Sequence, residues 1–163
     1  MPYQPAGLSN QWVVSQGEDR YRRAVYINVR RSTRYPSLAV FDAPSRENCT
    51  ARRIRSDSPL QALSTLNDPA FFEAAQSMAA RIVKEGGADP SSKVNYGFRL
   101  ATARIPSAKE KDMLLSAYDK NQQYFQRNLT EAEGLAGKPD AELAAWTMVS
   151  NALLNLDETL TKK

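Results

Sequence analysis

The sequence predicts an all-α protein, a compact bundle of about five to six helices with a long irregular N-terminal arm. The first observation is a set of helix-start signals at Ser58, Asp68 and Ser107, each a capping residue followed by Pro or, three positions later, by Gln or Glu. The second is the recurrence of apolar residues at helical spacing after each signal. The third is the last segment, which is apolar around most of a helical circumference and therefore belongs in the core.

Residues 1–57 are the predicted arm. The apolar residues of 20–31 fit a helix, although some of them also fit the alternation of a strand. In 34–57 no period persists, and Pro36 and Pro44 favour an extended, ordered loop. A loop of more than about twenty residues is long for a compact domain, so it is functional, wraps over the core, or is misassigned.

Residues 58–163 are the predicted helical core. Gly86 and Gly87 end the second of its helices. The stretch 128–139 contains two Gly and one Pro, which favour a linker between the last two helices. Helices are expected at 59–66, 69–85, around 94–101, at 108–127 and at 140–160.

The segment 140–160 is predicted to be the central buried helix. Its leucines, with Trp146 and Val149, recur at spacings of three and four. Asn151 and Asn155 lie four residues apart on the same segment. An unpaired buried amide costs a few kcal/mol, so we expect both side chains to hydrogen-bond to loop backbone.

Composition limits the classes of function. The 163 residues are 42% hydrophobic and 25% charged, enough for one domain with its own core. No apolar run approaches the roughly 20 residues of a membrane helix, and no secretory signal opens the chain, which as written would stay in the cytoplasm. With one cysteine, Cys49, and no histidine, an internal disulfide and a c-type haem attachment site are excluded. We expect no cofactor and no metal site in this chain.

Arginine is concentrated near the N-terminus. Residues 1–55 hold ten arginines and no lysine against four acids, a net charge of +6, whereas the remainder carries −2. Arginine without lysine favours planar, bidentate pairing with carboxylate, phosphate or carbonyl groups. We favour internal salt bridges and carbonyl contacts over an anion-binding surface, because charge in a sequence indicates partners rather than a site.

The segment SLAVFDAPSRENCTARRIRSDSPLQALSTLND at Ser37–Asp68 has an order of Pro, Arg, Cys and Asn that is too particular for generic amphipathicity. Further characteristic segments are PYQPAGL at Pro2–Leu8, GEDRYRRAVY at Gly17–Tyr26, YGFRLATARIPSAKE at Tyr96–Glu110 and AELAAWTMVSNALLNLDETLTKK at Ala141–Lys163. Together they resemble a planctomycete family known as a domain of unknown function, number fifteen fifty-three. Where that family commonly has Thr-Asn-Thr, this chain has Ser56-Asp57-Ser58. Ser58 can still cap the following helix, but Asp57 lacks the side-chain amide of the family's Asn.

The resemblance implies a helical C-terminal module of large secreted proteins that often carry a planctomycete-type cytochrome c. The chain is then the C-terminal part of a longer parent, and its partners are the parent's upstream domains, some of them haem-bearing. The parent would reside in the periplasm or cell envelope, whereas the localisation of this chain stays open. The resemblance transfers no catalytic residue.

The densest group of polar residues is the one candidate site in the sequence. Paired carboxylates beside arginines can perform acid/base chemistry on a sugar or an ester, but spacing does not show that Asp42 faces Glu47. Cys49 lacks a histidine to form its thiolate, which favours a small buried apolar residue. The candidate cluster is Asp42, Arg46, Glu47, Arg52, Arg53 and Arg55.

The favoured function is non-catalytic, as an assembly or ligand-support module. One alternative is a carbohydrate- or ester-directed hydrolase domain that uses Asp42 and Glu47. A second is binding of nucleic acid or another polyanion by the Arg-rich arm, since the pI is about 9.3. The net charge of only +4 and the lack of a nucleic-acid motif disfavour nucleic acid and leave an anionic ligand or polysaccharide.

Overall fold

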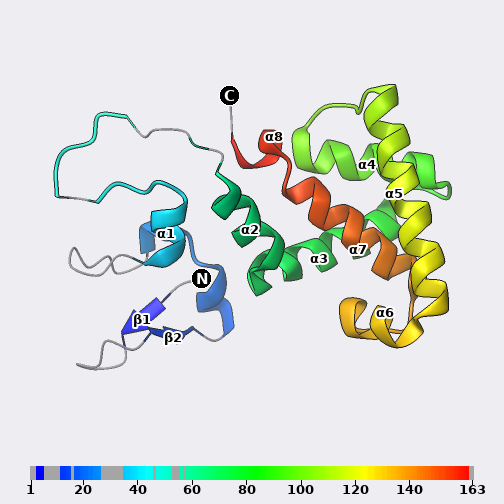
Figure 1. Cartoon of the computed structure of the whole chain (residues 1–163), viewed down its shortest axis with the longest axis horizontal. Helices are drawn as coiled ribbons and strands as arrows, with labels where there is room; N and C mark the ends of the chain where they lie inside the picture. The colour runs from blue at the N-terminus through cyan, green and yellow to red at the C-terminus, as the bar shows by residue number, and fades with distance from the viewer. Residues whose placement is uncertain are drawn as a thin grey trace. The chain divides into compact units, whose positions relative to one another are not determined.

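The chain divides into two units by contact, residues 1–64 and residues 65–163, and each is described by itself. The computed structural model is drawn in Figure 1. The boundary falls within α2 (Pro59–Asn67), after Ser64. That the whole chain is a single domain stays a prediction. The structure describes residues 3–5, 12–15, 17–26, 35–45, 47–52, 56 and 58–161.

Short elements make up the first unit up to α2. The strands β1 (Tyr3–Pro5) and β2 (Trp12–Val14) pair antiparallel. Two 3₁₀ turns follow, η1 (Gly17–Tyr21) and η2 (Ala24–Tyr26), and then the five-residue helix α1 (Pro36–Val40). Two strands of three residues leave the all-α class unchanged.

The arm differs from the prediction in two places. The described part of 20–31 forms 3₁₀ turns rather than an α-helix or a strand, and 27–31 lie outside the described residues. The expected loop 34–57 contains α1, which Pro36 opens at a position where its missing N–H is not needed. Five residues are too few for an apolar period to become visible, so a sequence pattern could not find this helix.

Helices make up the second unit. Across the described residues of both units, six helices of eight residues or more are present, which confirms the predicted class and the number of helices. None of the helices in the described part of the chain is long and apolar enough to cross a membrane. After α2 come α3 (Pro69–Glu85), α4 (Pro90–Thr102), α5 (Ala108–Arg127), α6 (Leu129–Ala136), α7 (Ala141–Leu154) and α8 (Asp157–Leu160).

The predicted helix starts are confirmed by their hydrogen bonds. At α2 the backbone N–H of Ser58 donates to the Gln61 side chain at 3.0 Å, and the N–H of Gln61 donates to the Ser58 hydroxyl at 3.3 Å. Asp68 accepts a backbone N–H of α3 at 2.8 Å. At α5, Ser107 and Glu110 complete a capping box. Each cap satisfies N–H groups that a helix cannot pair internally.

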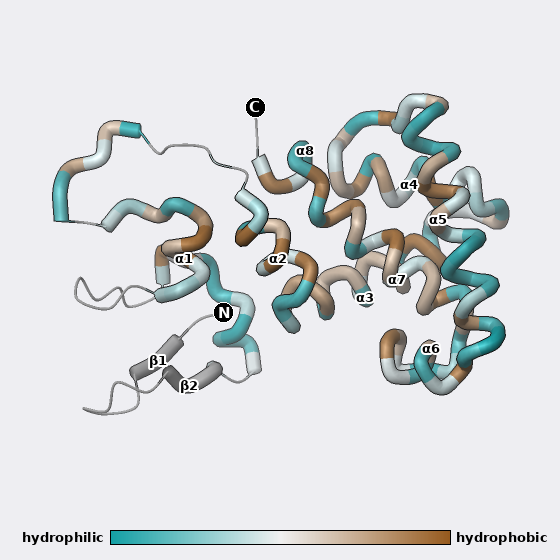
Figure 2. Tube along the Cα trace, in the orientation of Figure 1, coloured by the Kyte–Doolittle hydropathy of each residue, from teal (hydrophilic) through white to brown (hydrophobic). Residues whose placement is uncertain are grey.

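The helix α7 is the central buried helix, as its pattern predicts. It contacts α3, α4, α5 and α6, and Trp146, Val149 and Leu153 are at most 2% exposed. The Trp146 ring stacks on Tyr118 of α5 with the ring centroids 4.5 Å apart. Figure 2 shows the hydrophobic character of α7 against the hydrophilic outer turns of α5. Burial of these large side chains on α7 therefore contributes to the apolar core of the second unit.

The linker predicted at 128–139 is wrong, because most of it is α6. Ala132 is fully buried, and Leu135 packs against the same core. Gly137, at φ 72°, ends the helix in the left-handed conformation that suits glycine. Gly134 lies inside α6 without ending it. Packing of a short apolar stripe therefore outweighs the low helix propensity of one glycine.

The single helix predicted at 140–160 is also wrong, because the chain breaks between α7 and α8. Asn155 ends α7, and its side-chain oxygen accepts a hydrogen bond from the Thr65 hydroxyl. Asn151 donates to the carbonyl of Leu66 at 3.4 Å, a group in the last turn of α2 that has no partner within its own helix. Asn151 thus makes the predicted contact with backbone, although at a helix end rather than in a loop. Asn155 instead bonds to a side chain.

Candidate functional site

The most specific segment of the sequence leaves α1 through a Schellman motif. The N–H of Ala43 donates to the carbonyl of Leu38 at 2.8 Å, and the N–H of Asp42 donates to that of Ala39 at 3.2 Å. This motif requires a left-handed residue just after the helix, and Asp42 takes that conformation at φ 52°. The backbone of Asp42 therefore serves to end α1.

The buried amide of Gln61 joins the end of α1 to the start of α2. Its Nε2 donates to the carbonyl of Val40 at 2.8 Å and lies 2.8 Å from the Ser56 hydroxyl and 3.3 Å from Asp42 Oδ2. The Ser56 hydroxyl also donates to Asp42. Gln61 is only 5% exposed, and a buried amide must be hydrogen-bonded to be tolerated. We call Asp42, Ser56, Ser58 and Gln61 the signature network.

The two carboxylates predicted as an acid/base pair have different surroundings. Both are exposed, but Asp42 belongs to the signature network, whereas the backbone N–H of Glu47 donates to the Ser45 hydroxyl at 3.4 Å. No hydrogen bond within the described residues joins Asp42 to Glu47 or to Arg52, which is exposed. Of the other members of the candidate cluster, Arg46, Arg53 and Arg55 lie outside the described residues.

Cys49 is exposed, so the prediction of a small buried residue is wrong. The described residues 47–52 around it are bends or have no regular structure, and all of them are exposed. A cysteine is buried only where an element packs over it, and a segment of this kind supplies none.

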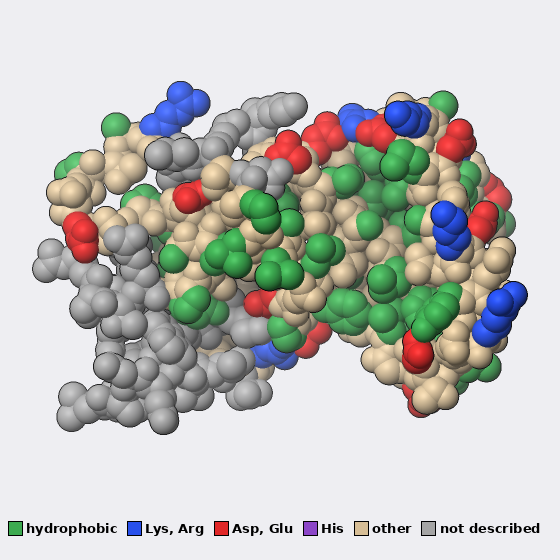
Figure 3. Space-filling model, viewed as in Figure 1, with side chains coloured by type: hydrophobic (Ala, Val, Ile, Leu, Met, Phe, Trp, Pro, Cys, Tyr) green, Lys and Arg blue, Asp and Glu red, His purple; other side chains and the backbone are tan. Residues whose placement is uncertain are grey.

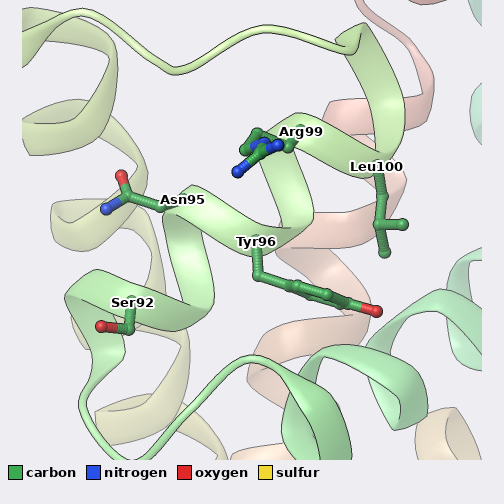
Figure 4. Close-up of a pocket in the computed structure, with 5 residues that line it drawn as sticks. All are labelled: Ser92, Asn95, Tyr96, Arg99 and Leu100. Atoms are coloured by element: carbon green, nitrogen blue, oxygen red, sulfur yellow. The ribbon is translucent and has the colours of Figure 1, made fainter.

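A second candidate site lies on one face of α4, within the second unit. A pocket there has a volume of about 550 Å³, and Figure 4 shows the side chains that line it, spaced along a single helix face. Ser92, Asn95 and Arg99 form its polar edge, and Tyr96 and Leu100 form its apolar edge. Residues three and four apart lie next to each other on a helix. We call these five residues the α4 strip.

The aromatic ring of the α4 strip is held from the neighbouring helix. The Tyr96 hydroxyl donates to the Glu85 carboxylate, which also pairs with Arg81 at 3.1 Å. The hydrogen bond to Glu85 raises the pKa of Tyr96, and the same bond, with that from Arg81, lowers the pKa of Glu85. The hydroxyl of Tyr96 is therefore anchored to the end of α3.

Arg104 connects three helices beside the α4 strip. Its guanidinium lies 2.6 Å from Glu110 at the start of α5 and 2.8 Å from Glu158 in α8. It also lies over the Phe98 ring, 4.7 Å from the centroid, a favourable cation–π distance. The bond to Arg104, with that to Ser107, lowers the pKa of Glu110 to about 2. These contacts make Arg104 a structural connector.

The sequence contains a signal for the α4 strip. Tyr96, Arg99 and Leu100 fall within the segment Tyr96–Glu110. The spacing of the strip places its residues on one helix face. The opposite, apolar face of the same helix, with Val94 and Phe98, belongs to the core.

Groups that hold metals are lacking in the described part of the chain. No cluster there has three or more His, Cys, Asp or Glu side chains placed to bind a metal ion. The expectation that the chain carries no cofactor stays a prediction.

Comparison with known proteins identifies the family. The model of the family described as "PSD1: Protein of unknown function (DUF1553)" matches residues 1–118. The match includes the signature network and the α4 strip and ends within α5. No curated protein and no solved structure matches the chain. Since the match spans more than half of the 163 residues, the chain belongs to the PSD1 family of proteins of unknown function.

Proposed function

We propose that this chain is a non-catalytic assembly or ligand-support module of a larger, envelope-associated planctomycete protein linked to a cytochrome c. Its partners are the upstream domains of that protein, which are haem-bearing where they include the cytochrome c.

The observation that carries this proposal is the signature network. Four polar residues of the most specific segment bond to one another and to backbone: Gln61 to Val40, Ser56 to Asp42, and Ser58 to Gln61. An active site instead needs acids, bases or nucleophiles directed at the position of a substrate. A motif whose polar groups hold its own backbone supports a scaffold role.

An apolar face next to the network supports assembly. The helix α2 has no charged residue, and Leu60, Leu63 and Leu66 are 55%, 58% and 40% exposed. Hydrophobic side chains gather over α2 in Figure 3. Depletion of charge together with exposed large apolar residues is typical of the centre of a protein interface.

Site-directed photo-crosslinking in the source cells tests the assembly role. A crosslinking amino acid at position 63 should give a covalent product with a polypeptide segment that stains for haem. Position 113, where Met113 on α5 is 64% exposed, is the matched control and should give no such product. Equal products at both positions, or none at position 63, would remove the assembly proposal.

The hydrolase alternative has a separate test. Asp42→Asn keeps an oxygen acceptor and tolerates the left-handed backbone, and Glu47→Gln keeps the shape of an exposed side chain. The assembly proposal requires the double variant to retain every activity of the parent towards glycosides and esters. A loss of about a hundredfold or more, as removal of a general acid or base produces, would favour the hydrolase.

Binding of polyanions by the arm is the remaining alternative. Among its described arginines, Arg22 pairs with Asp19 at 2.6 Å, and Arg20 lies 5.7 Å from the ring centroid of Tyr21, contacts that favour internal use. Retention on DNA at low salt that weakens steeply as salt increases, and that is lost on changing Arg52, Arg53 and Arg55, would favour this alternative.

A further inference from the structure

The α4 strip has the size and composition of a ligand site. Its pocket of about 550 Å³ lies in the range of roughly 300–1,000 Å³ that is usual for small-molecule sites. All five of its residues come from one regular helix, and sites on helices hold their side chains more precisely than sites on loops.

The polar edge of the strip has hydrogen-bond donors that a ligand can use. Asn95 and Arg99 lie one helical turn apart, and in Figure 4 both side chains lie on the same side of the helix as Ser92. Within the described residues, neither the Asn95 amide nor the Arg99 guanidinium has a hydrogen bond or an ion pair to another side chain. The neighbouring cations differ from Arg99 in this respect: Arg81, Lys93 and Arg104 each pair with a glutamate.

The apolar edge offers a flat surface of fixed orientation. Glu85 holds the Tyr96 hydroxyl, so the ring is fixed before a ligand arrives. Leu100, 39% exposed, lies one turn further along the same edge in Figure 4. An aromatic ring beside an aliphatic side chain binds the C–H face of a ring-shaped ligand, and a fixed ring loses little conformational entropy when it does so.

We propose that the α4 strip binds a carboxylate-bearing sugar, such as a uronic-acid unit of a polysaccharide. The Arg99 guanidinium pairs with the carboxylate through two parallel hydrogen bonds. The Asn95 amide, which both donates and accepts, binds a neighbouring hydroxyl, and the sugar ring lies on Tyr96 and Leu100. A nucleic acid fits less well, because strong binding to a phosphate backbone needs several cations and the strip has one.

This inference names the ligand of the proposed ligand-support function and therefore rests on it. Failure of the ligand inference can be distinguished from failure of the proposed function, because the crosslink at position 63 does not involve α4. A chain that crosslinks to a haem-bearing segment but binds no sugar would retain the assembly role and lose the ligand.

Calorimetric titration of the full chain with a short oligogalacturonate tests the proposal. A neutral oligogalactan of equal length tests the need for charge, and a sulfated galactan distinguishes carboxylate from any anionic sugar. We expect binding of the oligogalacturonate, weaker binding of the sulfated galactan, and none of the neutral one. In Arg99→Gln, loss of a charge-assisted pair should weaken binding about tenfold or more.

Matched variants make the test specific to the strip. Arg127→Gln changes an exposed arginine in the last turn of α5 and should leave affinity unchanged. Arg99→Lys keeps the charge without the planar fork and should give an intermediate loss, while Tyr96→Phe should bind better than Tyr96→Ala. Absence of binding by the unaltered chain, equal binding of the neutral sugar, or equal losses in Arg99→Gln and Arg127→Gln would overturn the proposal.

Discussion

Gln61 holds the exit of α1 and the entry of α2 through one buried side chain. Gln61→Leu has a similar volume but leaves the Val40 carbonyl and the Ser58 N–H without their partners. Each buried polar group left unpaired costs about 1–3 kcal/mol. We expect hydrogen exchange of the turn after Val40 and of the first turn of α2 to become faster by about tenfold or more.

The control for this variant lies on the same helix. The Ser64 hydroxyl donates to the Leu60 carbonyl at 2.9 Å, a local bond whose loss in Ser64→Ala should change stability by less than about 0.5 kcal/mol. Equal protection from exchange in Gln61→Leu and Ser64→Ala would contradict the role given to the amide.

Two helical glycines should respond oppositely to the same change. A Cβ on Gly97 of α4 would lie 2.7 Å from Ile82 Cδ1 and 3.4 Å from Leu153 Cδ1, and Ile82 is fully buried. Gly97→Ala should therefore lower the free energy of unfolding by about 1–3 kcal/mol. A Cβ on Gly134 of α6 meets nothing within 4 Å, so Gly134→Ala should raise it by about 0.5–1 kcal/mol.

Urea unfolding followed by helical circular dichroism compares the two glycine variants. Destabilisation of both, or stabilisation of both, would show that the close approach of α4 to α3 does not depend on the missing Cβ of Gly97.

At the residue scale, the sequence could predict capping residues better than candidate site residues. Ser58, Asp68 and Ser107 act through neighbours within a few positions, so local spacing identifies them. The partners of Asp42 lie up to 19 residues away, and only the folded chain brings them together. The exposure of Cys49 likewise depends on what packs over it.

At the element scale, the start of α5 makes stability depend on acid pH. The folded-state pKa of Glu110, about 2, lies below its ordinary value because Arg104 and Ser107 bind the charged form. The contribution of Glu110 is fully present above its ordinary pKa, about 4.5, and is lost as the pH falls from there towards 2. The difference in stability between the unaltered chain and Glu110→Gln should shrink over this interval.

Chemical denaturation at several pH values between neutrality and 2 measures that difference. Glu133→Gln, which changes an exposed acid on α6, is the control and should show no such trend. A difference for Glu110→Gln that stays constant down to pH 2 would rule out the pairing with Arg104.

Element boundaries were predictable where a cap marks them and unpredictable where packing decides. The starts of α2, α3 and α5 follow from hydrogen-bonding residues in the sequence. The helix α6 forms because Ala132 is buried by the rest of the unit, and α7 ends because Asn155 bonds to Thr65, 90 residues away. No local pattern contains either fact.

At the scale of the whole molecule, the core responds to alkaline pH through Tyr118. Burial first, and then the charges of Glu142 and Asp119, raise its pKa to about 12. The pKa of Tyr118 in the folded state exceeds that in the unfolded state, about 10. The contribution of Tyr118 to stability is therefore constant below pH 10 and is lost as the pH rises from 10 to 12. Thermal unfolding across this interval should show a steeper loss in the unaltered chain than in Tyr118→Phe.

The exposed Tyr26 of η2 provides the comparison for Tyr118. Tyr26→Phe should leave the alkaline loss of stability in place, because this side chain is 69% exposed. Identical pH profiles for the unaltered chain and Tyr118→Phe would contradict the burial of the phenol beside Trp146.

The all-α class of the whole molecule followed from sequence periodicity because most of its core is built from regular helices with one apolar face. The candidate site on the α4 strip did not follow, since such a group of residues has no period of its own and depends on the three-dimensional surroundings of each side chain.

We propose that this PSD1 chain works as part of a haem-bearing assembly. The most direct measurement is the haem content of the native particle that carries the chain in its source cells, isolated under mild conditions with an antibody against the chain. The account predicts haem absorbance in a fixed ratio to the chain, in a species much larger than 18.2 kDa. A haem-free species of 18.2 kDa would contradict it.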